Sequence, residues 1–256
     1  MGQGMAGFSL AGRTVLLTGA GRGIGRALFV HLAAAGAGRV IAVGRDAAAL
    51  DALSTLAPIA TPYPADLADP AERAALVAYL TEKEPDLSVV INNAGTQLPT
   101  DLINPDAARY LPALAGEIAV NFAAPIDLCV ALLPGLIARP SAMIVNITSG
   151  LAIAPKSGAP VYCAAKAGLR SFTKALRYQA EARAPQLRIV EALPPLVDTE
   201  MTRGRGSGKI SAEAAAAEIV RGMAAAKPEI YVGKAKLLRA IHSLSPALAD
   251  RLMRAG

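Results

Sequence analysis

The sequence predicts one α/β domain, built on a doubly wound parallel β-sheet with helices on its faces. Short apolar runs alternate with longer alanine-rich segments of helical period, which is the pattern of repeated βαβ units. The runs are apolar throughout rather than alternating, as expected of strands that are buried on both faces. No linker or internal repeat divides the 256 residues, a length that one large domain can use. We therefore expect a single domain that spans residues 1–256.

Six apolar runs are the expected strands, at residues 14–19, 39–44, 87–95, 142–149, 187–195 and 229–233. The expected helices lie between them, at residues 26–35, 70–81, 113–137 and 162–184. Asp46, Asp69 and Ser211 stand where helices would begin, since short polar side chains cap the first backbone amides of a helix. Residues 1–10 are expected to form an N-terminal tail. Residues 199–256 are expected to form a substrate loop and C-terminal helices.

Composition narrows the class of protein. Hydrophobic residues make up 53% of the chain and charged residues 18%, which excludes a disordered protein. The net charge is +6, but the basic residues are scattered and only four Phe and six Tyr could stack on bases, so we expect no nucleic-acid partner. An anionic small ligand fits the charge better. The cysteines (Cys129, Cys163) and histidines (His31, His242) predict neither disulfides nor a metal site.

The location of the protein is predicted from what the sequence lacks. The N-terminus has no charged segment followed by an apolar core, as a signal peptide would, and Ala6 breaks the myristoylation pattern. The most apolar long stretch, residues 118–138, is interrupted by Asn121, Pro125, Asp127 and Pro134, so we expect no membrane span. A cytoplasmic protein is the expectation.

A glycine-rich turn follows the first expected strand. The sequence TGAGRGIGRAL, residues 18–28, places Gly19, Gly23 and Gly25 between a buried strand and a helix. Glycines there let backbone amides approach a pyrophosphate, while the helix N-terminus favours its negative charge. The spacing departs from G-x-G-x-x-G, so a simple tight turn is the other interpretation. The position between strand and helix favours a dinucleotide site.

Tyr162 and Lys166 are spaced i, i+4 in the helical segment PVYCAAKAGLRSF, residues 160–172. This spacing puts both side chains on one helix face, although a lone pair of this kind is often accidental. Hydride transfer to a carbonyl needs a proton donor for the developing alkoxide, and the pKa of a free tyrosine is near 10. An ammonium one turn away favours the phenolate. We therefore expect Lys166 to lower the pKa of Tyr162.

In this order along the chain, the motifs resemble those of the short-chain dehydrogenase/reductase family. They are Thr18-Gly19-x-x-x-Gly23-Ile24-Gly25, Asp66-Leu67, Asn92-Asn93-Ala94-Gly95, Asn121, Ser149, Tyr162-x-x-x-Lys166 and Pro194…Thr199. The resemblance covers essentially the whole chain. It implies a Rossmann-type sheet, a nicotinamide cofactor, and a homodimer or homotetramer built on the two long helices after the fourth and fifth long strands.

The resemblance also implies the catalytic residues. Tyr162 would be the acid/base, Ser149 would hydrogen-bond the substrate oxygen, and Lys166 would also hold the nicotinamide ribose hydroxyls. Asn121 would hold a water that relays protons to Lys166. An asparagine followed by Pro125 could instead mark a helix distortion, and the two interpretations are compatible.

The cofactor residues implied by the resemblance begin with the glycine turn, which includes Gly19, Gly23, Ile24 and Gly25. Asp66 would accept a hydrogen bond from the adenine amino group, and the Leu67 backbone would border the ring. Asn93, Ala94 and Gly95 would line the adenosine ribose, whereas Asn92 is expected to be structural. The Val197 backbone and Thr199 would contact the carboxamide. The chain departs from the family at Pro194-Pro195, where Pro-Gly is common, and a second proline stiffens this approach.

Two arginines predict which dinucleotide binds. An NAD site needs a carboxylate about 20 residues after the glycine turn, which binds the ribose hydroxyls. An NADP site has arginine instead, which binds the 2′-phosphate. Gly44 stands where NAD-dependent members usually carry Asp, while Arg45 and Arg22 can approach a 2′-phosphate. Asp46 is the competing observation, but it is expected to cap a helix. We predict NADP(H).

The sequence thus predicts an NADP(H)-dependent oxidoreductase that interconverts a ketone or aldehyde and an alcohol. A catalytically silent NADPH-binding sensor or scaffold is the alternative, and a related sugar-nucleotide epimerase or dehydratase would need a longer chain. The substrate stays open. Basic residues of the loop (Arg203, Arg205, Lys209) would suit an anionic substrate, such as an acyl-carrier thioester or a carboxylate. Apolar neighbours (Leu151, Ile153, Pro155, Met201) would suit hydrophobic ketones, and a solvated loop is equally expected.

The C-terminal segment carries an apolar stripe, broken by Pro246, of Leu237, Leu238, Ile241, Leu244, Leu248 and Leu252. Packing on the protein's own surface or on a partner subunit is the expected role. An interfacial helix or a lid over the substrate site is the alternative.

Overall fold

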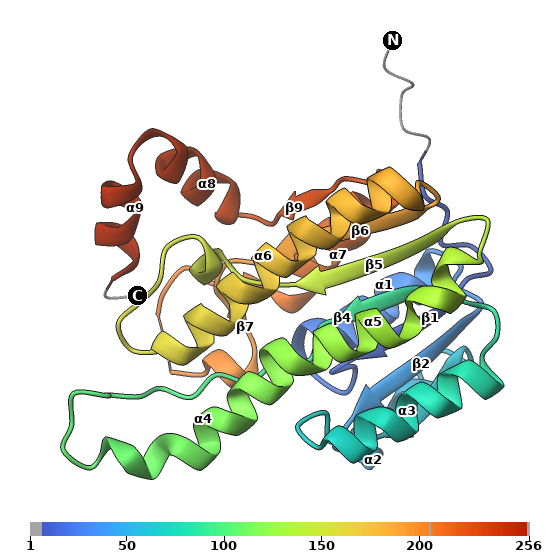
Figure 1. Cartoon of the computed structure of the whole chain (residues 1–256), viewed down its shortest axis with the longest axis horizontal. Coiled ribbons are helices and arrows are strands. Elements are labelled where there is room, and N and C mark those ends of the chain that lie inside the picture. The colour runs from blue at the N-terminus through green and yellow to red at the C-terminus, as the bar shows by residue number, and fades with distance from the viewer. Residues whose placement is uncertain (1–6, 205, 255–256) are drawn as a thin grey trace.

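The protein is built on a sheet of seven parallel strands with helices on both faces, as a computed structural model of residues 7–204 and 206–254 shows (Figure 1). The strand order is β3-β2-β1-β4-β5-β6-β9, and each neighbouring pair is parallel. The strands are β1 Thr14–Thr18, β2 Arg39–Gly44, β3 Ala60–Pro64, β4 Leu87–Asn92, β5 Ala142–Ile147, β6 Leu187–Leu193 and β9 Glu229–Tyr231. The doubly wound, Rossmann-type sheet that the sequence predicted is therefore confirmed.

Two apolar cores lie on opposite faces of this sheet. Helices α1 Gly23–Ala34, α2 Ala47–Ser54 and α7 Ala212–Ala224 cover one face. Helices α3 Pro70–Lys83, α5 Ala124–Ile137 and α6 Pro160–Arg183 cover the other face. In Figure 1, α3, α5 and α6 lie in front of the strands. Because the strands are parallel, their carboxyl ends share one edge of the sheet. Ligands of such sheets bind at this edge.

The expected helix caps are present. The carboxylates of Asp46 and Asp69 accept hydrogen bonds from the Ala49 and Ala71 amides, at 3.1 and 2.7 Å. Ser211 caps α7 in the same way, at 3.1 Å.

Strand β3 was not predicted, because its sequence ATPYP contains two prolines. Proline removes a backbone donor and is confined to edge strands or bulges. Strand β3 lies at the edge of the sheet, so it needs backbone donors on only one side. A small two-stranded pairing of β7 Val197–Asp198 with β8 Ile210–Ser211 was also not predicted, and it brackets the loop between them.

The long helix expected at residues 113–137 is interrupted. It consists of α4 Leu111–Ile118, a π-helical turn Ala119–Ala123, and α5. The turn contains Asn121 and precedes Pro125, so the helix distortion that the sequence allowed is present. The stretch Ala107–Ile137 is long and apolar enough to cross a membrane by length and composition alone, which is a weak criterion that core helices also meet. Here α5 buries Leu128 and Leu132 against the sheet.

The chain ends in two short helices, α8 Ala235–Leu244 and α9 Pro246–Met253, with the break at Pro246. They lie at the end of the molecule toward which the β5 arrow points (Figure 1). Much of the apolar stripe faces away from the protein: Leu237, Leu244, Leu248 and Leu252 are 62, 90, 47 and 57% exposed. Packing on the protein's own surface is therefore limited to the inner sides of α8 and α9, where Ala235 and Ala249 are buried.

Candidate active site

The glycine turn between β1 and α1 has a backbone that only glycine fits. A Cβ atom at Gly25 would lie 1.9 Å from the Gly19 carbonyl oxygen, and Gly19 and Gly23 have φ angles of +67° and +52°. No side chain caps α1, and its first turn holds no acidic residue. Ile24 packs its side chain on the core. The first amides of α1 thus have the arrangement that binds a phosphate anion, so the turn fits a dinucleotide.

The run Asn93-Ala94-Gly95 is fastened to this turn by Thr18, a residue whose role the sequence analysis did not identify. Thr18 Oγ1 accepts hydrogen bonds from the amides of Asn93 and Ala94, both at 3.0 Å. Asn93 Nδ2 donates to the carbonyls of Thr18 and Gly19, at 3.0 and 3.2 Å. Asn93 therefore holds the glycine turn in shape, in addition to any contact with a ribose.

Asn92 has the structural role that was expected of it. Its Nδ2 donates to Asn146 Oδ1 at 2.8 Å, which links the buried strands β4 and β5.

The residues expected around the adenosine lie after β2 and β3. Arg45 is exposed directly after β2, whereas Asp46 is engaged as the cap of α2. Arg22 pairs with Glu200 at 3.2 Å, and both side chains are well exposed. Asp66 closes a local turn by accepting from the Ala68 amide at 3.0 Å.

Leu67, which follows Asp66, is buried in the core. Its carbonyl accepts from Arg73 at 2.8 Å. The backbone of this segment is thereby fixed at the sheet edge.

The four expected catalytic residues come together at the carboxyl edge of β4 and β5. Ser149 follows β5 and lies near enough to the Tyr162 hydroxyl of α6 to lower its pKa. Ser149 Oγ also accepts from the Leu151 amide at 3.1 Å, which fixes its orientation. Lys166 Nζ lies 5.9 Å from the centre of the Tyr162 ring and donates to the Ile147 carbonyl at 2.9 Å.

Asn121 reaches the same place from the π-helical turn. Its Nδ2 donates to the Thr96 carbonyl at 2.6 Å and to the Glu117 carbonyl at 3.0 Å, while its Oδ1 accepts from the Thr96 amide at 3.3 Å. A Cβ atom at Gly95 would lie 2.9 Å from Asn121 Oδ1 and 3.6 Å from Lys166 Nζ. Gly95 thus lies between Asn121 and Lys166, and a larger residue there would separate them.

Burial sets the protonation of Tyr162 and Lys166. It raises the pKa of Tyr162 from 10.0 to about 12, although the hydrogen bond from Ser149 opposes the shift. It lowers the pKa of Lys166 from 10.5 to about 8, because the ammonium loses its water. We expected Lys166 to lower the pKa of Tyr162. That expectation is wrong, because the pKa of Tyr162 is raised. Desolvation of the phenolate is the largest cause of the shift, and Lys166 Nζ donates to the Ile147 carbonyl instead.

Glu117 is a buried carboxylate that the sequence analysis passed over. Its Oε1 accepts from the Leu98 amide at 3.2 Å, and its negative charge adds to the rise in the Tyr162 pKa. Burial raises the pKa of Glu117 as well. One feature of the sequence could have identified Glu117: it is a lone charge in an apolar helix, one helical turn before Asn121.

The segment after β6 closes over the glycine turn. Val197 is buried in β7, and the Thr199 methyl would lie 3.0 Å from a Cβ atom at Gly23. An open cleft lies beside this contact, lined by the start of α1, residues 198–200 and the start of α7. Thr199 is therefore adjacent to the proposed phosphate site.

The basic residues of the loop differ in their exposure and in the contacts that they make within the loop. Lys209 Nζ donates to the Thr202 carbonyl at 2.7 Å and pairs with Asp198 at 3.3 Å, so it is engaged within the loop. Arg203 is exposed, and Arg205 lies outside the described residues. Of the apolar residues considered for a ketone pocket, Leu151, Ile153 and Met201 are half-buried and Pro155 is exposed.

Known proteins resemble this chain in sequence and structure. The sequence model of the short chain dehydrogenase family matches residues 13–209. The "Uncharacterized oxidoreductase DltE" of Bacillus subtilis is 37% identical over 196 residues, which cover 77% of this chain and 76% of that protein. The "Ketoacyl reductase HetN" of a Nostoc species is 30% identical over 266 aligned positions, which cover 96% and 90%. A Burkholderia cenocepacia short chain dehydrogenase solved with NADP has a TM-score of 0.82 and 26% identity, and the match covers 96% of this chain and 99% of that one.

Proposed function

Because this chain belongs to the short-chain dehydrogenase/reductase family and is an oxidoreductase of that type, we propose that it uses NADP(H) to interconvert a ketone or aldehyde and an alcohol. The observation that carries the proposal is that Ser149, Tyr162 and Lys166 lie together at the sheet edge that also holds the glycine turn. A silent NADPH-binding sensor would have no need of that arrangement. The proposed location is the cytoplasm.

In the proposed reaction each side chain has one task. NADPH, when bound along the glycine turn, would supply the hydride that reduces the carbonyl carbon. Ser149 would hold the carbonyl oxygen by a hydrogen bond. Tyr162, protonated across neutral pH, would give its proton to the developing alkoxide. The Lys166 ammonium would hold the nicotinamide ribose hydroxyls, and Asn121 would keep the backbone of Gly95 and Thr96 in place beside Lys166.

NADP(H) is proposed over NAD(H) because of the charges at the end of β2. Arg45 is exposed there, and the carboxylate that follows it, Asp46, is engaged with α2. Arg22 would become a second phosphate ligand once its pair with Glu200 opens. That step costs little, since both side chains are more than half exposed and surface ion pairs are weak.

The test is reduction of a panel of ketones, aldehydes and ketoacyl thioesters, followed by the absorbance of NADPH or NADH. We expect turnover with at least one carbonyl and a preference for NADPH. Arg45→Asp should weaken NADPH binding by about 10- to 100-fold, the range for a charged hydrogen bond, and NADH binding far less. The matched control is Arg183→Asp, the same charge change at the far end of α6. Equal losses for both dinucleotides would reject the assignment of Arg45.

The pKa values predict how reduction depends on pH. Between about pH 6 and about pH 8, Tyr162 and Lys166 both hold their protons, so these groups leave kcat/KM constant. Above about pH 8, Lys166 loses its charge and kcat/KM should fall. The folded-state pKa of Lys166 lies below its usual 10.5, so its deprotonation stabilises the fold as the pH rises between these values. The fall would therefore not reflect unfolding caused by this group, and a profile that stays flat to about pH 10 would contradict the role of Lys166.

A homo-oligomer is also proposed, through the outer faces of α5 and α6. Val130 and Ile137 on α5 are 56 and 42% exposed, and Tyr178 on α6 is 58% exposed. Apolar side chains gathered on an outer face are typical of surfaces that bind a partner.

A further inference from the structure

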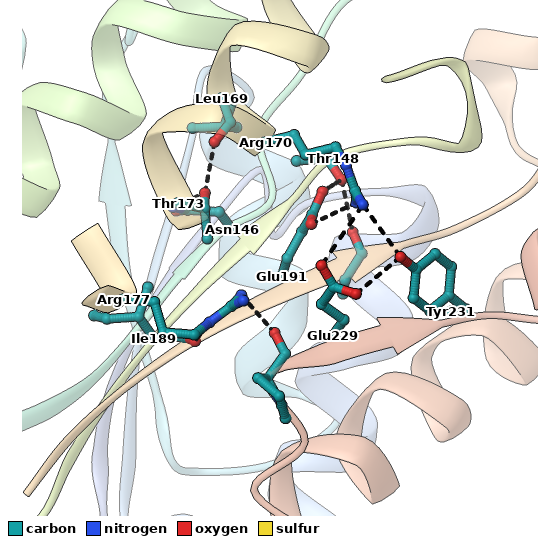
Figure 2. Close-up of polar contacts among 12 residues, drawn as sticks. Asn146, Thr148, Leu169, Arg170, Thr173, Arg177, Ile189, Glu191, Glu229 and Tyr231 are labelled. Atoms are coloured by element: carbon teal, nitrogen blue, oxygen red, sulfur yellow. Dashed lines mark hydrogen bonds and ion pairs between the residues drawn. The ribbon is translucent and has the colours of Figure 1, made fainter. Parts of the chain in front are cut away.

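An ion pair between Arg170 and the buried Glu191 joins α6 to β6 (Figure 2). Glu191 on β6 has a side chain that is 2% exposed. One of its carboxylate oxygens accepts from Thr148 Oγ1 at 2.6 Å, and the other accepts from Arg170 Nη1 at 2.7 Å. Both oxygens are thus occupied by neighbours on two different elements.

The same arginine continues the network toward the C-terminus (Figure 2). Arg170 Nη2 donates to the Tyr231 hydroxyl at 3.2 Å and lies 3.6 Å from Glu229. Tyr231 in turn donates to Glu229 at 2.9 Å. The Arg239 guanidinium of α8 lies 4.6 Å from the centre of the Tyr231 ring, which is a cation–π contact.

One end of this network is attached to the catalytic residues. Thr148 immediately precedes Ser149, and its amide is also held by the Ala192 carbonyl at 2.9 Å. Arg170 lies one helical turn beyond Lys166 and two beyond Tyr162, so the three share one face of α6. The strand end that carries Ser149 and the helix that carries Tyr162 are therefore fixed relative to each other through Glu191.

The other end is attached to the C-terminal helices. Leu238 of α8 would lie 3.2 Å from a Cβ atom at Gly150, the residue that follows Ser149. Ser157, in the loop before α6, donates through its amide and its hydroxyl to the Arg254 carbonyl, at 3.0 and 2.9 Å. The network thus ends at β9 and α8, and α8 packs beside Gly150, next to Ser149.

Stability alone does not account for this pair. Glu191 is a buried charge in the middle of a strand whose other residues, apart from Arg188 near its start, are apolar, and burying an ion pair there is often less favourable than packing apolar side chains. Burial raises the pKa of Glu191, and the Thr148 hydroxyl and the Arg170 charge oppose that rise. Buried polar groups of this kind fix geometry.

We propose that Glu191 and Arg170 are positioning residues with two separate effects, which rest on the proposed function. Through Thr148 they fix Ser149 against Tyr162, and this end sets the rate of the chemical step. Through Tyr231 they hold α8 beside Gly150, and this end sets the affinity for the carbonyl substrate.

Removing one hydroxyl at each end separates the two effects. Thr148→Val should lower kcat about tenfold with KM unchanged, because a mispositioned hydrogen bond weakens the transition state. Tyr231→Phe should raise the KM for the carbonyl about tenfold with kcat unchanged, since it loosens substrate binding only. Both variants should bind NADPH as the wild type does. Glu191→Gln should show both effects together, and the two hydroxyl deletions still decide the question if that variant fails to fold.

The matched control is Arg177→Met, which changes a buried arginine elsewhere on α6. Arg177 donates to the carbonyls of Ile189 and Pro228, at 2.8 and 2.7 Å, and thus ties β6 to the start of β9 without contacting Thr148 or Tyr231 (Figure 2). It should lower Tm and leave kcat and KM as they are. If Arg177→Met changes kcat or KM as much as the two test variants do, the network is only structural and the proposal is wrong.

Hydrogen exchange of the free protein supplies a readout that needs no turnover, so failure of the proposed function can be told from failure of this inference. Glu191→Gln should speed exchange in two separate segments, residues 148–152 and α8, while Arg177→Met should not. Absence of turnover in the wild type on every carbonyl would count against the proposed function alone. Unchanged exchange in α8 of the Glu191→Gln and Tyr231→Phe proteins would overturn the inference.

Discussion

Replacing Tyr162 with phenylalanine is expected to lower kcat for carbonyl reduction by about 10²- to 10⁴-fold, the contribution typical of a general acid. The change removes one hydroxyl, the group that Ser149 orients and that burial keeps protonated. NADPH binding should stay within about twofold of the wild type, because the glycine turn and Lys166 are untouched. Single-turnover reduction and NADPH fluorescence titration measure the two quantities separately.

The control for this experiment is Tyr178→Phe. Tyr178 lies on the same helix and is 58% exposed, far along α6 from Ser149. This variant should keep wild-type kcat and Tm. Turnover by Tyr162→Phe at the wild-type rate would remove Tyr162 from the mechanism, and equal losses in both variants would indicate a general effect on α6.

Gly25→Ala is expected to abolish dinucleotide binding and to lower Tm. The new methyl carbon would lie 1.9 Å from the Gly19 carbonyl oxygen and 2.7 Å from Asn93 Nδ2. Both atoms belong to the framework that holds the turn, so neither can move without breaking the bonds between Asn93 and residues 18–19. Overpacking of this kind typically costs about 1–3 kcal/mol and occasionally more. We expect a loss in NADPH affinity of at least about 100-fold, because the phosphate-binding amides are displaced.

Gly135→Ala is the matched control, since a Cβ atom at Gly135 meets nothing within 4 Å. Gly135 lies inside α5, where alanine is favoured over glycine by about 0.5–1 kcal/mol, so Tm should rise slightly. Thermal unfolding and NADPH titration of both variants make the comparison. Wild-type affinity in Gly25→Ala would show that the turn does not hold the dinucleotide.

Patterns that repeat along the chain predicted most of the fold. Six of the seven sheet strands stand out as apolar runs, and caps such as Asp69 mark where helices begin. The exception, β3, has local residues that oppose a strand, and only its place at the sheet edge makes them acceptable. The interruption of the long helix at Asn121 was anticipated only as one option, because the side-chain bonds that stabilise it reach Thr96, which is distant in sequence.

The sequence also predicted which residues would meet at the site, through the order of the motifs. It did not predict their protonation, because the i, i+4 spacing of Tyr162 and Lys166 says nothing about how deeply each is buried. Nor did it reveal that Glu200 would engage Arg22 or that Glu191 would connect Thr148 to Arg170. Such contacts join elements far apart in the chain, and no local pattern encodes them.

The two borders of the sheet affect how copies of this protein can associate. The Ala65 amide donates to Gly44, so alternation along β3 turns the backbone nitrogens of Pro62 and Pro64 outward, where neither carries a hydrogen. The opposite border, β9, is only three residues long. Neither border offers the long row of free donors that lets an incoming chain extend a sheet, a common route to aggregation. Self-association of the folded protein should therefore proceed through helix faces. No further strand should be added to the seven-stranded sheet.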